Sequence, residues 1–181
     1  MGLTYLVSLG VGIGMVSSQN GFALRFRDKL IRDANATSPI TKSLSSGNRL
    51  RAAVLDCGAN LFLGAIPNTV GGLAIVPPYP MAAFRGWVGG VVSVNNKHRS
   101  RLANLNQAVY YLGVLLLQIV PYTLAGGAGV KLGQRTYRAW NDKSIAKWWF
   151  MPEDAAQDVL WIYSVVAPLF LIASMVEFLA A

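Results

Sequence analysis

The chain has few of the residues on which soluble enzymes and metalloproteins depend. Its 181 residues include one cysteine, one histidine and eight acidic residues. One cysteine excludes an intrachain disulfide, and one cysteine with one histidine cannot build a Cys/His metal site within the chain. Ser/His, Cys/His or paired-carboxylate sets at a common depth are also missing, so we expect neither a metal centre nor an enzyme.

Charge is scarce as well, whereas hydrophobic residues are abundant. Charged residues make up 13% of the chain, hydrophobic residues 54%, and the mean hydropathy is +0.42. These values are typical of an integral membrane protein. The net charge of +8 comes from basic residues between the apolar runs, which favours anchoring to anionic lipid headgroups over nucleic-acid binding. The predicted partners are membrane lipids and other integral membrane subunits. We expect no cofactor, and a bound lipid or pigment stays open.

The stretch of residues 57–96 organises the chain. It is uncharged from Cys57 to Phe84, and Arg85 is its only charge before Lys97. Prolines, a glycine pair and two asparagines interrupt it: Pro67, Pro77, Pro78, Pro80, Gly71, Gly72, Asn60 and Asn68. In hydrocarbon such breaks survive only where protein or a cavity surrounds them. The stretch therefore predicts a helical pair or broken helix at the centre of a bundle.

Arg85 is predicted to face the protein interior. A cation at mid-depth costs about 2.5–3.5 kcal/mol on insertion scales unless it snorkels or pairs. Its candidate partners are carbonyls freed by the prolines just upstream, or Asp56. The alternative places Arg85 at a bilayer surface, with the helix beginning after Pro80.

The remaining apolar runs predict further spans. Residues 2–18 favour a transmembrane helix over a signal peptide, because no basic segment precedes the run. Gly10 and Gly14 fit a small-xxx-small packing face there, and no preceding strand supports a dinucleotide fingerprint. Gln118 lies within the run 104–130, where Asn60 is one candidate partner for an interhelical hydrogen bond.

Two long polar segments separate these runs. In residues 19–51, Phe22, Phe26 and Leu30 can share one helical face among cations such as Arg25 and Arg27. That pattern fits a helix in the membrane interface or a solvated helix on a partner subunit, and the two stay open. Residues 131–158 combine cations with aromatic residues that predict headgroup anchors: Trp140, Trp148 and Trp149.

Three blocks of the sequence resemble the stage II sporulation protein M family of integral membrane proteins. They are Asn60 with Gly71-Gly72 and Arg85-Gly86-x-x-x-Gly90, then LAGGAGVKLG at 124–133, and APLFLIASMVEF at 167–178. With the glycine-rich first helix, they follow the family's order over most of the chain. The resemblance implies a polytopic helical protein of a prokaryotic cytoplasmic or internal membrane.

The sequence departs from this family at its titratable positions. Many members carry Pro-His-Gly and a Glu on the fourth helix, where this chain has Gly113, Val114, Leu115 and Gln118. Arg85 also replaces the family's Asn beside Gly86. The family's role in spore formers is therefore not transferred.

The predicted fold is an all-α membrane bundle forming one domain, residues 1–181. About five spans are expected, at roughly 2–18, 52–68, 70–95, 104–130 and 158–178, with a tight turn at Asn68–Gly72 joining the second and third. Interfacial amphipathic helices occupy the two polar segments. Counting Lys and Arg places the first polar segment in the cytoplasm. The resemblance implies the opposite orientation.

The favoured function is a non-catalytic structural or assembly subunit of a larger membrane complex. The alternative is a transporter, channel or lipid-handling permease with its site at the broken helix 67–80. Gly86 and Gly90 lie on one helical face, and we expect them to meet a matching surface of Gly126, Gly127 and Gly129.

Overall fold

The structure, a computed structural model, describes residues 1–145 and 151–179, and these ranges contain helices and no strand. Its helices are α1 (Gly2–Ser17), α2 (Gly21–Thr37), α3 (Pro39–Ser45), α4 (Arg49–Gly58), the π-helix η1 (Ala59–Ala65), α5 (Ile66–Gly71), the 3₁₀ turn η2 (Gly72–Ala74), α6 (Pro78–Val91), the 3₁₀ turn η3 (Arg101–Ala103), α7 (Leu105–Asn141) and α8 (Glu153–Leu179).

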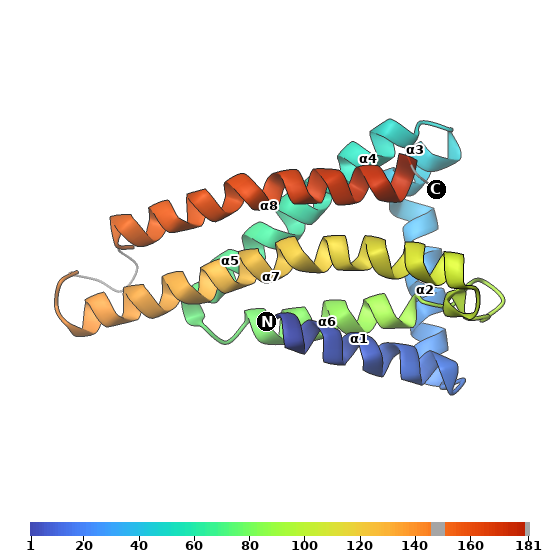
Figure 1. Cartoon of the computed structure of the whole chain (residues 1–181), viewed down its shortest axis with the longest axis horizontal. Coiled ribbons are helices and arrows are strands. Elements are labelled where there is room, and N and C mark those ends of the chain that lie inside the picture. The colour runs from blue at the N-terminus through green and yellow to red at the C-terminus, as the bar shows by residue number, and fades with distance from the viewer. Residues whose placement is uncertain (146–150, 180–181) are drawn as a thin grey trace.

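The long helices run side by side along one axis, and α2 lies across one end of them (Figure 1). The continuous helix from α4 through η2, together with α7 and α8, gives the bundle its length. The shorter helices α1 and α6 pack against each other, and both lie beside α7. We call the end where α2 lies the α2 end, and the opposite end the far end.

Three helical segments are long and apolar enough to cross a membrane: Arg49–Ala74, Leu105–Asn141 and Glu153–Leu179. The all-helical, membrane-compatible fold is therefore confirmed, whereas the count of five spans is not. The helices α1 and α6 have 16 and 14 residues. At 1.5 Å per residue they measure about 24 and 21 Å, less than the roughly 30 Å of a hydrocarbon core.

The predicted turn at Asn68–Gly72 is wrong, because the helix continues through it to Ala74. The break lies at residues 75–77, where Ile75 has a positive φ of 66° and two prolines follow. Proline supplies no backbone N–H, so Pro77 and Pro78 cannot extend the preceding helix, and Pro78 instead begins α6.

Glycines bring α1 and α6 into backbone contact. A Cβ added at Gly12 would lie 2.9 Å from the Cα of Gly90, and one at Gly86 would meet the backbone of Tyr5. The two helices run in the same direction, with higher residue numbers opposite each other. The structure differs here from the prediction for α1, because Gly10 and Gly14 have nothing within 4 Å of an added Cβ.

The rotation of α1 explains this difference. Its buried residues are Tyr5, Leu9, Gly12 and Val16, which repeat at helical spacing and place Gly12 on the face toward α6. Two residues correspond to a rotation of about 200° around a helix. Gly10 and Gly14 therefore lie on the opposite side.

A second glycine contact joins the end of α5 and η2 to α7. A Cβ at Gly129 would lie 2.7 Å from the Cα of Thr69, and one at Gly133 would lie 2.7 Å from the carbonyl oxygen of Leu73. A Cβ added at Gly72 would likewise meet the backbone of α7, at Gly129. The predicted contact between the glycines of α6 and those of α7 is therefore not what the structure shows. Gly127 has no atom within 4 Å of an added Cβ.

Large apolar side chains cover the outside of the bundle. On α1, Leu3, Val7 and Val11 are 76%, 58% and 53% exposed, and on α8 Leu160 and Trp161 are 71% and 75% exposed. On α1 these side chains recur every four residues, so they form an apolar stripe rather than isolated surface positions. Such faces suit contact with lipid or with other membrane helices.

The first polar segment folds as α2 and α3 at the α2 end. Phe26 of α2 packs on α6, with its ring centroid 4.8 Å from Trp87 and 6.2 Å from Phe84. Arg25 is exposed, and its role as an interfacial anchor stays a prediction. The prediction that Arg27 is an interfacial anchor is wrong, because this residue is only 3% exposed and donates hydrogen bonds inside the protein.

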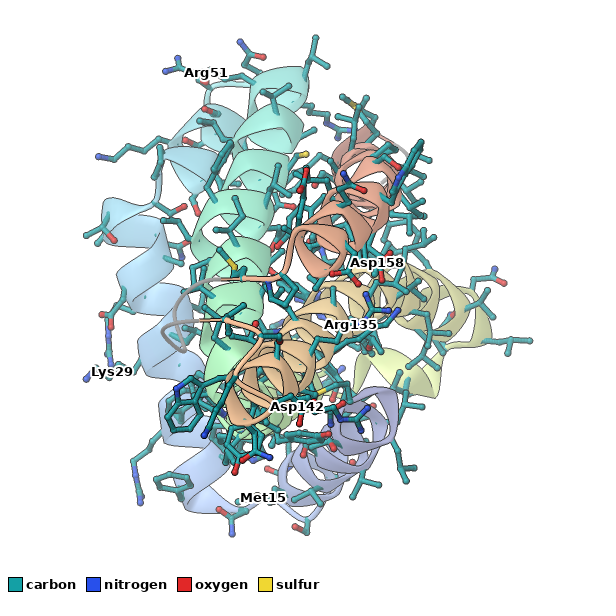
Figure 2. All side chains as sticks on the ribbon, turned by 90° about the vertical axis from the view of Figure 1, so that its left-hand side faces the viewer. Met15, Lys29, Arg51, Arg135, Asp142 and Asp158 are labelled. Atoms are coloured by element: carbon teal, nitrogen blue, oxygen red, sulfur yellow. The ribbon has the colours of Figure 1, made fainter. Side chains whose placement is uncertain are left out.

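At the far end, α7 and α8 extend as a charged helical pair. Arg135 forms ion pairs with Asp158 at 3.0 Å and Asp154 at 3.2 Å, and Lys131 pairs with Asp158 at 3.1 Å. Figure 2, viewed from this end, shows Arg135 and Asp158 close together at the front of the molecule. Trp140 is 45% exposed near the end of α7, while Trp148 and Trp149 lie outside the described residues.

Candidate functional site: a polar cleft inside the bundle

A cleft of about 1160 Å³ extends from the α2 end into the bundle. Its lining comes from α1, the α3–α4 region, η1, α6, the loop before η3, α7 and α8. The side chains that carry polarity or rings into it are Tyr5, Arg49, Asn60, Phe84, Arg85, Asn95, Arg101, Gln107, Tyr110, Tyr111, Gln118, Tyr122, Glu177 and Phe178. Residues 67–80 contribute nothing to this lining, so the cleft does not lie at the predicted broken helix.

Arg85 lies deep in this cleft, where α6 approaches η1 and α7. Its guanidinium carbon is 4.1 Å from the centroid of the Tyr122 ring, a cation–π contact. Gly64 makes room for both groups, because an added Cβ would lie 2.8 Å from Tyr122 Cε1 and 3.0 Å from Arg85 Nη1. The contact places the cation within the protein. Arg85 therefore contacts the aromatic face of Tyr122 instead of the carbonyls freed by the upstream prolines, which were its predicted partners.

A hydrogen-bonded chain joins α4, η1, α7 and α8 beside Arg85. The Oδ2 atom of Asp56 accepts bonds of 2.8 Å from both Asn60 Nδ2 and Ser174 Oγ. The hydroxyl of Tyr122 donates to Asn60 Oδ1 at 2.6 Å. Asn60 thus connects the carboxylate of Asp56 to Tyr122, whose ring contacts the guanidinium of Arg85. The sequence suggested Asn60 as a buried polar residue. It did not indicate that Ser174 donates to the same Asp56 carboxylate as Asn60 does.

A second carboxylate lines the wall nearer the α2 end. Gln118 Nε2 donates to Glu177 Oε2 at 2.6 Å, joining α7 to α8. This replaces the predicted Gln118–Asn60 hydrogen bond. Tyr110 donates to the backbone oxygen of Glu177 at 2.9 Å, which further holds the end of α8 against the start of α7.

The π-helix η1 positions Asn60 and Gly64 on the cleft. Pro67 lacks an N–H, and its ring clashes with the carbonyl four residues earlier, so the preceding turn widens. The N–H of Ile66 accordingly donates to the carbonyl of Leu61, five residues back. Single π turns are frequent at functional sites because they redirect side chains. Here the wide turn supplies both the polar group and the gap for Arg85.

The loop between α6 and α7 forms one rim of the cleft and is fastened to α2. Arg27 donates to the carbonyl of Val94 at 3.2 Å and to Asn96 Oδ1 at 2.8 Å. Asp28 lies 3.0 Å from His98 Nε2 and accepts a 2.9 Å bond from Arg27. Hydrogen bonding from His98, and then from Arg27, lowers the pKa of Asp28. These contacts fix Asn95, which lines the cleft.

Aromatic residues and a cation stand where the cleft approaches the α2 end. Tyr111 donates a hydrogen bond to the carbonyl of Gly89 on α6. The guanidinium carbon of Arg101 lies 5.9 Å from the centroid of the Tyr111 ring. Arg101 and Tyr111 thus form a second cation–π contact like that of Arg85 and Tyr122, but nearer the α2 end.

The other predicted polar residue, Asn68, lies outside the cleft. It is 2% exposed and packs against Gly126, where an added Cβ would lie 2.7 Å from its Nδ2. Its neighbour Thr69 connects three helices, donating to the Ala125 carbonyl at 2.9 Å and lying 2.7 Å from the Tyr163 hydroxyl. These residues hold helices together rather than forming the cleft.

Comparison with protein-family models, curated proteins and solved structures finds no match. The resemblance to the stage II sporulation protein M family therefore stays a prediction. Among residues 1–145 and 151–179, no three His, Cys, Asp or Glu side chains lie close enough together to hold a metal ion. The chemistry available in the cleft is that of three guanidinium groups, the Glu177 carboxylate, amides and phenols, and Asn60 links this lining to the carboxylate of Asp56.

Proposed function

We propose that this chain is an integral membrane protein that takes a small molecule into the cleft, a transporter or lipid-handling permease. The carrying observation is a cleft of about 1160 Å³ whose inner part holds Arg85, Asn60 and Tyr122 within a bundle of mainly apolar helices. Polar residues at membrane depth are costly and are functional candidates by default. Ligand sites also combine apolar walls with a few convergent polar groups.

The test blocks the cleft without touching its hydrogen bonds. Val88→Trp fills the cleft from α6, while Val120→Trp adds the same bulk to a position on α7 that is 47% exposed. Native mass spectrometry from lipid nanodiscs should show a bound small molecule on the wild type and on Val120→Trp. Val88→Trp should lose it. Identical spectra for all three folded proteins would contradict the proposal.

A structural or assembly subunit of a larger membrane complex is the second candidate. It draws support from the charged helical pair at the far end, where α7 continues to Asn141 beyond Lys131 and α8 begins at Glu153. Co-purification in mild detergent separates the two functions. A stable stoichiometric complex with another membrane protein favours the subunit, and a homogeneous single species favours the permease.

The cellular setting we propose is the cytoplasmic or an internal membrane of a prokaryote, as the sequence resemblance implies. Within it, the α2 end faces the cytoplasm, because ten of the sixteen Lys and Arg lie in the two connections at that end. A reporter fused to the loop at Gly47, active only in the cytoplasm, tests this orientation. An inactive reporter at this position, together with a signal there from a second reporter that is active only outside the cytoplasm, would reverse it.

A further inference from the structure

Arg85 is a cation in the cleft whose contacts in the structure are aromatic rather than anionic. It is partly buried, and its guanidinium lies over the Tyr122 ring. Within the described part of the chain, no carboxylate lies within 4 Å of it. A charge in a low-dielectric site interacts strongly with any opposite charge that enters. The cleft therefore offers Arg85 to an incoming anion.

The two acidic side chains nearby are already engaged by neutral donors. Asp56 accepts from Asn60 and Ser174, and Glu177 accepts from Gln118. These bonds hold the carboxylates on the wall made by α4 and α8, away from the guanidinium. Within the described residues no carboxylate pairs with Arg85, and an arginine fork suits carboxylate and phosphate groups in particular.

The walls between Arg85 and the α2 end combine aromatic side chains with aliphatic ones such as Val88 and Leu115. Phe84, Tyr110, Tyr111 and Phe178 line this part, with Arg101 over the Tyr111 ring. Such a surface favours an apolar body over a fully hydrated ion. We propose that the cleft binds an organic anion, a carboxylate or phosphate group on an apolar body, with the anionic group on Arg85. This inference rests on the proposed function.

The experiment compares matched probes that differ in charge. Decanoate and decanol represent a ligand that partitions from the membrane, and benzoate and benzyl alcohol represent one that arrives from water. Each is titrated into the full chain in detergent, and the shift of the unfolding temperature gives the apparent affinity. The proteins are the wild type, Arg85→Gln, and Arg135→Gln as a control at the far-end ion pairs.

We expect one anionic probe to bind the wild type and Arg135→Gln at least tenfold more tightly than its neutral partner. Arg85→Gln should lose this preference. Preference for decanoate points to a membrane-derived ligand, and preference for benzoate to a soluble one. Equal affinities for charged and neutral probes in all three proteins, or no saturable shift with either anion, would overturn the inference.

Two further variants keep the test decisive. If Arg85→Gln does not yield folded protein, Gly64→Ala serves instead, since its Cβ would press on Arg85 Nη1 and Tyr122. Gly58→Ala, with nothing within 4 Å, is its control. Gly64→Ala should lose the anion preference and Gly58→Ala should keep it. Neutral probes that bind the wild type but not Val88→Trp would leave the proposed function standing while the anion inference fails.

Discussion

Replacing Gly90 by alanine should separate α1 from α6. The added Cβ would lie 2.7 Å from both the Cα of Gly12 and the N of Ile13, whereas non-bonded carbons rest at about 3.5–4.0 Å. All its close contacts are backbone atoms, so no side chain can turn away. The helices must then move apart by about 1 Å, and a gap of that size loses about a quarter to a half of the dispersion attraction.

The magnitude follows from two opposing effects. Overpacking costs about 1–3 kcal/mol, and a purely backbone clash favours the upper value of about 3. Alanine is preferred over glycine in a helix by about 1 kcal/mol, which leaves a net loss of about 2. Gly14→Ala gains the same preference without a clash, because nothing lies within 4 Å. The two variants should therefore differ by about 3 kcal/mol, or about 100-fold in the unfolding equilibrium.

Equilibrium unfolding in mixed micelles, with a rising fraction of dodecyl sulfate, measures this difference. Near-ultraviolet circular dichroism follows the tertiary packing. Packing must supply the stabilisation between membrane helices, because lipid tails are as apolar as their side chains. Gly90→Ala should unfold at a clearly lower detergent fraction than the wild type, and Gly14→Ala should not. Coincident transitions for the two variants would refute the packing argument.

Three further outcomes are expected. Gly129→Ala should lose about 1–3 kcal/mol in the same titration, because its Cβ meets the α5 backbone, whereas Gly127→Ala, like Gly14→Ala, should gain about 1 kcal/mol from the helix preference of alanine. Arg27→Gln should cost about 1–3 kcal/mol by leaving buried loop groups unpaired, whereas Arg25→Gln should stay within about 0.5 kcal/mol. The lowered pKa of Asp28 adds stability above the unfolded pKa, which is lost as the pH falls through the folded value. Asp28→Asn should therefore reduce the fall of the melting temperature at acidic pH, and an unchanged fall would exclude a contribution of Asp28 to stability.

The sequence identifies elements better than it identifies their neighbours. Apolar runs between charges predict the helical spans, and glycine spacing marks faces that allow close approach. Neither signal says which face meets which, and Gly86 and Gly90 accordingly pack on α1 instead of α7. Rotation of a helix by two residues is enough to exchange Gly12 for Gly10 or Gly14. Only the tertiary arrangement sets that rotation.

The cleft shows the same limit. Arg85 and Asn60 stand out as polar residues in an apolar run, so the sequence points to them. The bond between Ser174 and Asp56 joins residues 118 positions apart, and nothing local marks it. Glu177 is close to the end of an apolar run, which predicts a membrane face or a contact with a neighbouring helix, and the sequence does not indicate that Gln118 of α7 holds it on the cleft wall. Hydrogen-bond partners across helices depend on depth and register, which periodicity does not encode.

The distribution of charge links the cleft to one face of the membrane. The connections at the α2 end carry ten Lys and Arg against two Asp, whereas the far-end segment 131–158 carries five Lys and Arg against four acidic residues. A surface of one sign raises the local concentration of oppositely charged molecules. The cleft reaches that surface past Arg101, and Arg85 lies at its inner part. Arginines thus line the cleft both near the α2 end and in its inner part. An organic anion entering from the α2 end would meet attraction first at the surface and again in the interior, which is the order that capture from water or from anionic lipid requires.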